Sequence, residues 1–185
     1  LSGGNTSKGQ LYRMTIFLSG GSKNGKSTLG ERAARALAGE GPLWYVATMI
    51  PHDEEDRARI RRHRQDREGC GFQTLEQGWD LSGCLAGRCG TFLVDSVTAL
   101  LANEMFRPDG SFDPDAPHRV RADLLRFAAG AEHAVFVCDF IFSDAGRYDG
   151  YTEAYRRGLA DIGKALAAYC DTVAETCGGN YILCK

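Results

Sequence analysis

The fold of this 185-residue chain is decided by the stretch Gly20-Gly21-Ser22-Lys23-Asn24-Gly25-Lys26-Ser27. It follows the apolar run 15–19 and opens a helical pattern, the context in which Gly-x-x-x-x-Gly-Lys-Ser forms a phosphate-binding loop, or P-loop. The glycines let backbone N–H groups point at phosphate oxygens, and the helix start adds partial positive charge. In such a loop Lys26 reaches the β- and γ-phosphates and Ser27 ligates Mg²⁺. A plain glycine-rich turn is the alternative, but pattern and context together favour a nucleoside triphosphate site.

Short apolar runs alternate with helical patterns along the rest of the chain. Continuously apolar strands separated by helices are typical of a mainly parallel sheet covered on both faces. We therefore expect an α/β, P-loop NTPase-like fold, with ligands at the carboxyl ends of the strands. The expected strands are 15–19, 43–47, 91–95 and 134–138; the expected helices are 27–38, 53–67, 97–106, 118–131 and 152–170; a small antiparallel C-terminal β pair is expected from 172–175 and 181–184 across Gly178-Gly179.

Composition narrows the class of protein. Residues 1–13 are polar and Gly/Ser-rich and are expected to be a flexible extension, with a single P-loop catalytic domain over 14–185. The net charge of −2 argues against a nucleic-acid partner. No apolar run reaches the roughly 18 residues that a membrane span needs. The seven cysteines include no C-x-x-C pair, so a zinc site is not expected; several of them are expected to be small core residues, in a reducing cytoplasm.

Asp95 is the expected second half of a magnesium site. It directly follows the apolar run 91–94, where P-loop proteins place an acid that holds the metal. The other interpretation of Asp95 is an N-cap for the helix beginning at Val97, and both roles could hold. Asp139, which follows another apolar run, is a second and weaker candidate for the acid.

The P-loop alone leaves the chemistry open. The chain has no Asn-Lys-x-Asp or Thr-Lys-x-Asp motif of the kind that switch GTPases use to read guanine. It is also short for a motor. These features favour a small-molecule kinase or a nucleotidyltransferase.

The predicted helix 53–67 has acids first and bases later, the order that suits the helix dipole. One interpretation is a solvated helix crossed by salt bridges. The other is a nucleophile, since the neutral imidazole of His63 can attack an α-phosphorus and hold a nucleotidyl group, while the arginines around it neutralise a triphosphate. We expect the remaining histidines, His52, His118 and His133, to be ordinary surface residues.

Several motifs in the same order carry a resemblance to a known family. They are the P-loop; Trp44-Tyr45-Val46-Ala47-Thr48; Arg59-Ile60-x-x-His63-Arg64-x-x-Arg67; Thr74-x-Glu76; and Leu93-Val94-Asp95-Ser96-x-Thr98 with Asn103 beyond it. From residue 14 to about 185 the chain resembles the bifunctional adenosylcobinamide kinase / adenosylcobinamide-phosphate guanylyltransferase family of cobalamin biosynthesis. The most specific motif is the Arg-Ile-x-x-His-Arg run at this distance from a P-loop.

The resemblance implies two reactions. ATP or GTP first phosphorylates the aminopropanol hydroxyl of adenosylcobinamide; GTP then guanylylates His63, and the GMP passes to adenosylcobinamide phosphate to give adenosylcobinamide-GDP. The resemblance also implies a homotrimer. It further implies that the nucleotide is held by Thr48, Met49, Ile50, Arg64, Gln65, Asp66, Arg67, Glu76 and Asp95, in addition to the P-loop. The carboxylate of Glu76 can accept hydrogen bonds from the guanine N1–H and exocyclic amine, although a plain surface glutamate is the alternative.

The second half of the chain departs from the family pattern. Cys138-Asp139-Phe140-Ile141 stands where Asn-Glu-Val-Gly is usual, and Gly163 stands where an Asn is usual. Segment 142–151 mixes aromatic and polar residues and is either a corrinoid-side loop or a surface loop. Two other functions therefore stay open: a P-loop small-molecule kinase without guanylyltransferase activity, and a non-enzymatic, nucleotide-gated binding protein.

Overall fold

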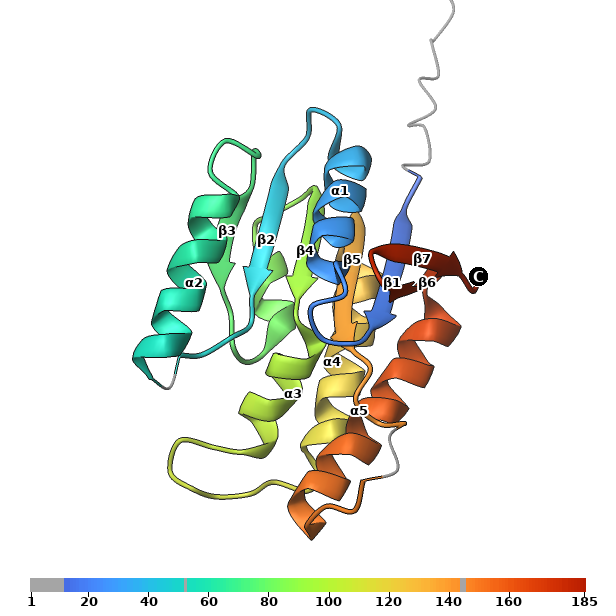
Figure 1. The fold of residues 1–185 in the computed structure, drawn as a ribbon. Helices are drawn as coiled ribbons and strands as arrows, with labels where there is room; N and C mark the ends of the chain where they lie inside the picture. The colour runs from blue at the N-terminus through green and yellow to red at the C-terminus, as the bar shows by residue number, and fades with distance from the viewer. Residues whose placement is uncertain (1–11, 52, 144–145) are drawn as a thin grey trace, which may run out of the picture.

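The computed structural model of the chain describes residues 12–51, 53–143 and 146–185 (Figure 1). The side chains of Arg59, His63 and Asp66 are not described. Most of the predicted flexible extension, 1–13, and the predicted surface residue His52 lie outside the described residues.

A seven-stranded sheet with the order β3-β2-β4-β5-β1-β6-β7 forms the centre of the molecule (Figure 1). The first six strands in this order are parallel, and β7 pairs antiparallel with β6. Both the mainly parallel sheet and the antiparallel C-terminal pair are therefore confirmed. The strands are β1 (Met14–Gly20), β2 (Leu43–Ala47), β3 (Gln73–Glu76), β4 (Thr91–Asp95), β5 (His133–Asp139), β6 (Thr172–Cys177) and β7 (Asn180–Leu183).

Strand β3 was not predicted. It has only four residues and lies at the edge of the sheet, where Gln73, Thr74 and Glu76 are exposed and Leu75 is half-buried. An edge strand with so few buried positions carries no continuous apolar run, which is the signal that marks buried strands. Its parallel pairing with β2 places Glu76 beside Ala47, at the carboxyl edge of the sheet.

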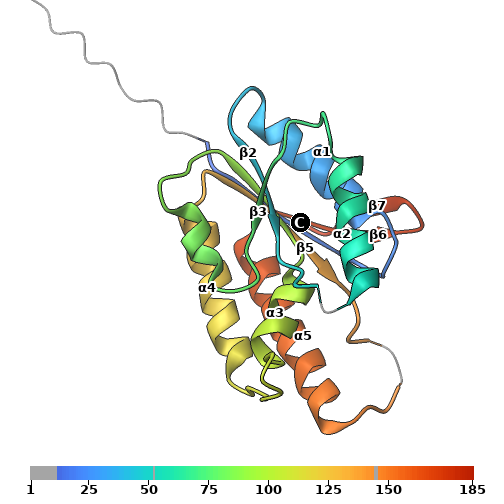
Figure 2. The same ribbon diagram turned by 90° about the vertical axis from the view of Figure 1, so that its left-hand side faces the viewer.

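Helices cover both faces of the sheet, as expected. Figure 2 shows α1 and α2 on one side and α3, α4 and α5 on the other. The helices begin and end within a few residues of the predicted positions. They are α1 (Lys26–Ala38), α2 (Glu54–Asp66), α3 (Val97–Met105), α4 (Ala116–Gly130) and α5 (Gly150–Tyr169), with a short 3-10 helix at Leu81–Leu85.

The core consists of two apolar layers, one on each face of the sheet. Strand β4 has an unbroken apolar sequence because it is buried on both faces. Phe92 and Val94 pack toward α3–α5, while Leu93 packs toward α1. Phe127 of α4 meets the edge of Phe92, with ring centroids 5.4 Å apart. Cys84, Cys138 and Cys170 are buried, as small core residues should be.

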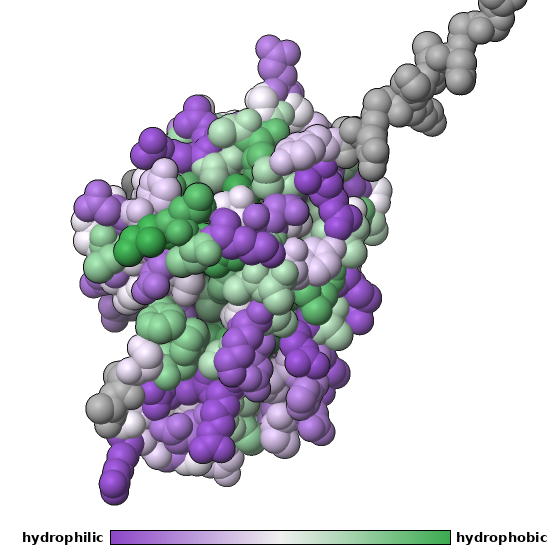
Figure 3. Space-filling view, turned by 90° about the vertical axis from the view of Figure 1, so that its right-hand side faces the viewer, coloured by the Kyte–Doolittle hydropathy of each residue, from purple (hydrophilic) through white to green (hydrophobic). Residues whose placement is uncertain are grey.

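The C-terminal hairpin leaves apolar side chains in solvent. Tyr181, Ile182 and Leu183 of β7 are 60%, 65% and 63% exposed. Figure 3, which faces this side of the molecule, shows hydrophobic residues at the surface among hydrophilic ones. Strand β7 is thus an open and partly apolar edge of the sheet.

No helix in the described ranges combines the length and the apolar character needed to cross a membrane.

Gly158 sets the distance between α4 and α5. A Cβ at this position would lie 2.6 Å from Cγ of Pro117, closer than atoms can approach, and the proline ring cannot swing away. We expect Gly158→Ala to lower the free energy of unfolding by about 1–3 kcal/mol, because overpacking outweighs the gain in helix propensity. Chemical denaturation measures this change.

Gly150→Ala is the matched control in the same helix, since a Cβ there would meet nothing within 4 Å. This substitution should be neutral or slightly stabilising. Equal effects of the two substitutions would contradict the packing argument.

Candidate functional site

The carboxyl ends of the parallel strands gather the predicted site residues along one edge of the sheet. Gly20, at the end of β1, is in register with Asp139 at the end of β5. Asp95, at the end of β4, is in register with Val137 on one side and Ala47 on the other. Strand β5 therefore separates the P-loop strand from the strand that ends in Asp95, and Asp139 lies between the two.

The P-loop joins β1 to α1 as predicted. A Cβ on Gly20 would lie 2.2 Å from Oγ1 of Thr176 and 2.6 Å from its backbone oxygen, so the close approach to β6 admits only glycine. Gly25 precedes the helix with a φ of 84°, a left-handed conformation that glycine adopts without strain. The backbone thus curls at the start of α1, where its N–H groups can bind an anion.

Lys26 is buried, with 6% of its surface exposed, and its ammonium group forms an ion pair within the protein. Nζ lies 2.8 Å from Oδ1 of Asp139 and donates a hydrogen bond of 2.5 Å to the carbonyl of Gly21. Asp139 is itself fixed, because its N–H donates to Oγ1 of Thr98 at 2.8 Å. A buried ammonium group needs a negative partner, and a bound phosphate would compete with Asp139 for this role.

Asp95 accepts a hydrogen bond of 2.8 Å from the hydroxyl of Tyr45 at Oδ2. Burial, followed by the charge of Asp95, raises the pKa of Tyr45 far above its ordinary value, so the hydroxyl stays a donor. The alternative role of Asp95 as a helix N-cap is wrong. Ser96 is the N-cap of α3, and its side chain accepts from the N–H of Ala99 at 3.2 Å. The carboxylate of Asp95 is therefore not used in capping.

The donor chemistry at this edge fits Mg²⁺ that arrives with a triphosphate. Mg²⁺ prefers oxygen ligands and usually keeps waters and substrate phosphates, so it needs few protein groups. The hydroxyl of Ser27 and the carboxylate of Asp95 are oxygen donors of this kind. Among the described residues no group of three or more His, Cys, Asp or Glu could hold a metal by itself. Ser27 and Asp95 would therefore each offer one oxygen ligand to such an ion.

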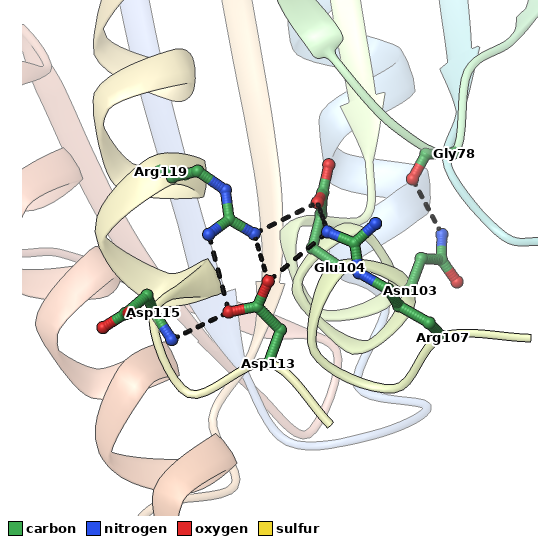
Figure 4. A network of polar contacts seen from close by, with 7 residues as sticks. All are labelled: Gly78, Asn103, Glu104, Arg107, Asp113, Asp115 and Arg119. Atoms are coloured by element: carbon green, nitrogen blue, oxygen red, sulfur yellow. Dashed lines mark hydrogen bonds and ion pairs between the residues drawn. The ribbon is translucent and has the colours of Figure 1, made fainter. Parts of the chain in front are cut away.

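Thr48 ties β2 to β4 through its side chain. Its hydroxyl donates to the carbonyl of Ser96 at 2.7 Å and accepts from the Ser96 N–H, also at 2.7 Å. Its carbonyl accepts from Nδ2 of Asn103 at 2.7 Å, and Asn103 also reaches the carbonyl of Gly78 at 3.1 Å (Figure 4). Asn103 therefore fixes the loop that carries Met49 and Ile50. The N–H of Thr48 donates to the carbonyl of Asp95 at 3.2 Å and the residue is completely buried, so each of its hydrogen-bonding groups already has a partner in the protein.

Further polar contacts fix the end of α3 beside this loop (Figure 4). Arg107 and Arg119 both contact Asp113, at 3.4 Å and 2.8 Å, and each also lies within 4 Å of Glu104. The hydrogen bond from Arg119 holds the pKa of Asp113 below its ordinary value. The two positive and two negative charges balance, which identifies a structural network that holds segment 106–115 against α3 and α4.

Helix α2 carries His63, whose backbone is helical as predicted. Of the other residues expected to hold the nucleotide, Arg64 forms an ion pair with Glu76, so these two are brought together, while Gln65 is exposed. Arg67, just after the helix, is buried and stacks on the Tyr45 ring, 3.5 Å from its centroid. The roles of these residues stay predictions, as do those of His63 and Asp66.

Tyr45 and Thr98 contact site residues but were not predicted as part of the site. A signal for Tyr45 was available, since a tyrosine on a buried strand must find a partner for its hydroxyl. The only sequence signal for Thr98 was its place in the motif 93–98, which is part of the resemblance to the family.

A surface hollow of about 960 Å³ lies elsewhere on the molecule. It runs along the outer face of α1 and is lined by Leu29, Arg32, Ala36, Gly71 and Tyr181 among others, but by no P-loop residue. The hollow is therefore separate from the phosphate site.

A comparison with known families adds an independent observation. The model of the family described as cobinamide kinase / cobinamide phosphate guanyltransferase matches residues 16–182. The chain belongs to this family. The match includes the P-loop, all of α2 and the carboxyl ends of strands β1 to β5.

Curated relatives of this chain include two bifunctional adenosylcobalamin biosynthesis proteins. CobU of Escherichia coli K12 is 34% identical over 106 residues, 55% of this chain and 56% of the relative. CobP of Pseudomonas aeruginosa is 38% identical over 103 residues, 52% of this chain and 56% of the relative. The matches thus span about half the length of these relatives. Among solved structures, flagellar accessory protein FlaH from Methanocaldococcus jannaschii has a TM-score of 0.48 at 15% identity, covering 93% of this chain and 78% of that one.

The pair formed by Lys26 and Asp139 leads to a test of the phosphate site. We expect Asp139→Asn to tighten binding of a fluorescent GTP analogue without Mg²⁺ by roughly three- to tenfold, because phosphate no longer competes with a carboxylate for Lys26. Fluorescence titration measures the dissociation constant. Added salt should reduce the difference between the dissociation constants of wild type and Asp139→Asn, since charge interactions near the surface are screened.

Arg107→Gln, in the network beside α3, is the control and should leave the dissociation constant unchanged. Weaker binding by Asp139→Asn would contradict the idea that Asp139 and phosphate compete for Lys26. It would indicate that Asp139 itself helps to hold the ligand.

Proposed function

We propose that this chain is a bifunctional transferase of cobalamin biosynthesis. It phosphorylates adenosylcobinamide with ATP or GTP, and then transfers GMP from GTP through His63 to form adenosylcobinamide-GDP. The observation that carries the proposal is the position of Lys26, buried at the carboxyl edge with Asp95 and Asp139 on neighbouring strands, in a chain of this family. The names of the relatives, which are bifunctional adenosylcobalamin biosynthesis proteins, support it.

The first reaction is a phosphoryl transfer. The aminopropanol hydroxyl oxygen of adenosylcobinamide attacks the γ-phosphorus, the bond to the β–γ bridging oxygen breaks, and a nucleoside diphosphate leaves while the hydroxyl proton passes to solvent. Lys26 and the P-loop N–H groups would hold the phosphates in line and neutralise their charge. Ser27 and Asp95 would hold Mg²⁺, which supplies further positive charge at the phosphates when bound.

The second reaction uses a different phosphorus atom. A neutral imidazole nitrogen of His63 attacks the α-phosphorus of GTP, and the bond to pyrophosphate breaks. A phosphate oxygen of adenosylcobinamide phosphate then attacks the same phosphorus, releasing His63 and forming the new diphosphate. The arginines of α2 supply positive charge near the reacting phosphates during both displacements.

The remaining predicted contacts belong to nucleotide recognition. We propose that Glu76 reads the guanine N1–H and exocyclic amine, and that its ion pair with Arg64 holds the carboxylate near the carboxyl edge. Residues 48–50 and 64–67 would surround the nucleotide. We further propose that the active form is a cytoplasmic homotrimer, as the family resemblance implies.

Removing the P-loop ammonium group tests the kinase reaction. We expect Lys26→Ala to lower phosphorylation of adenosylcobinamide by at least about 100-fold, because the charge that stabilises the transferred phosphoryl group is lost. The measurement is transfer of radiolabel from γ-labelled ATP or GTP to the corrinoid. Lys164→Ala, on the exposed side of α5, is the control and should retain full activity. Nucleotide hydrolysis without cobinamide-dependent transfer would instead favour a nucleotide-gated binding protein.

A covalent GMP adduct tests the second reaction. Incubation with α-labelled GTP, followed by denaturation, should leave label on the chain, and the bond should be acid-labile and alkali-stable like a phosphoramidate. His63→Asn should reduce the label to background while retaining cobinamide phosphorylation. His118→Asn, on exposed α4 surface, is the matched control and should label normally. Equal labelling of wild type and His63→Asn would exclude His63 as the nucleophile, and phosphorylation without any label would identify a kinase only.

A further inference from the structure

Tyr45 connects two parts of the site that lie on different elements. It is on β2, two residues before the strand ends, and its side chain is 6% exposed. Strands β2 and β4 are neighbours, with Ala47 in register with Asp95, so the Tyr45 hydroxyl reaches diagonally across to the end of β4. There it donates to Oδ2 of Asp95 at 2.8 Å.

The ring of Tyr45 carries a second contact. The guanidinium of Arg67 lies over it, 3.5 Å from the ring centroid, and Arg67 is 7% exposed. Its ion-pair partner Glu31 is 4.0 Å away, and its Nε is buried without a hydrogen-bond partner among the described residues. Among the described residues, the face of the Tyr45 ring is therefore the closest group that stabilises the buried charge of Arg67.

Arg67 also marks the point where α2 joins the rest of the molecule. The described side chains of α2 are exposed or half-buried, and the first buried residue after the helix is Arg67. The backbone N–H of Arg67 donates to the carbonyls of the last turn, at Arg64 and Gln65, so the residue is fixed to the helix end. One tyrosine side chain thus touches both the acid at the end of β4 and the end of the helix that carries His63.

We propose that Tyr45 is a positioning residue of the nucleotide site, which holds Asp95 with its hydroxyl and the end of α2 with its ring. This inference rests on the proposed function, which takes Asp95 as the acid that faces Mg²⁺ and nucleotide. With Oδ2 held by the hydroxyl, the carboxylate keeps one orientation and presents its other oxygen to the ligand. Groups that orient a metal-binding carboxylate in this way commonly change metal affinity by about ten- to 100-fold when they are removed.

A purely structural role for Tyr45 predicts different results. The ring also meets Phe72 edge to face, with centroids 6.0 Å apart, and belongs to the apolar layer beneath α1. Phenylalanine would satisfy these packing contacts and the contact with Arg67 equally well. Tyr45→Phe therefore removes only the hydrogen bond to Asp95, and it separates positioning from packing.

The test is the affinity for a fluorescent GTP analogue, measured with and without Mg²⁺ for wild type and Tyr45→Phe. We expect Tyr45→Phe to bind the analogue about tenfold more weakly than wild type in the presence of Mg²⁺. Without Mg²⁺ the two should bind with equal affinity, so that the variant loses most of the tightening that Mg²⁺ produces. In an Asp95→Asn background the same substitution should add nothing, because the two residues act as one unit. The thermal midpoint, recorded for each variant, verifies folding.

Tyr155→Phe is the matched control. Tyr155 is also mostly buried and also donates one hydroxyl hydrogen bond, at 2.9 Å, but to the backbone carbonyl of Thr98. Burial raises its pKa as well, so both hydroxyls are protonated donors. Tyr155→Phe should leave the Mg²⁺-dependent tightening at the wild-type value.

Tyr45→Leu tests the ring. It removes the surface under Arg67, so affinity should fall about tenfold further than in Tyr45→Phe, even without Mg²⁺. If this variant does not fold, Tyr45→Met fills the same space with a flexible side chain. Equal affinities of the Phe and aliphatic variants would overturn the role of the ring.

Identical Mg²⁺-dependent tightening in wild type and Tyr45→Phe would overturn the role of the hydroxyl and leave the proposed function intact. A wild-type chain that binds no nucleotide would instead overturn the proposed function, and this inference with it.

Discussion

Burial of the central strands on both faces is the constraint on which the rest of the structure depends. Strands β1, β4 and β5 lie between two layers of helices, and their side chains fill both apolar layers. Charged groups have no place within these strands, because an unpaired charge there would have to leave water without compensation. Polar chemistry is therefore confined to the strand ends, and parallel pairing brings those ends to a single edge.

The charges at this edge are connected in two groups. Lys26 is paired with Asp139, and Asp95 is linked through Tyr45 to Arg67 and then to Glu31. Each group contains positive and negative side chains, so its partly buried charges are compensated without a ligand.

The P-loop and helix α2, the two elements that we propose bind phosphate, differ in how firmly they are built into the fold. The P-loop is continuous with β1 and α1, and its first glycine lies directly against β6. Helix α2 lies beside the edge strands, with its described side chains mostly in solvent and a buried anchor at Arg67. This difference suits the proposed function, in which the P-loop would hold phosphates in place and α2 would deliver His63.

The sequence by itself determined the P-loop, the parallel sheet, the two helical layers and the C-terminal β pair, because local motifs and apolar periodicity report directly on burial. It also identified Asp95, Asp139 and the arginine-rich helix as candidates. Only the tertiary structure decided which strands are neighbours, that Lys26 pairs with Asp139, that Ser96 rather than Asp95 caps α3, and that Tyr45 joins Asp95 to Arg67. These contacts join residues far apart in the chain, and no local pattern encodes strand order or the direction in which a buried hydroxyl points.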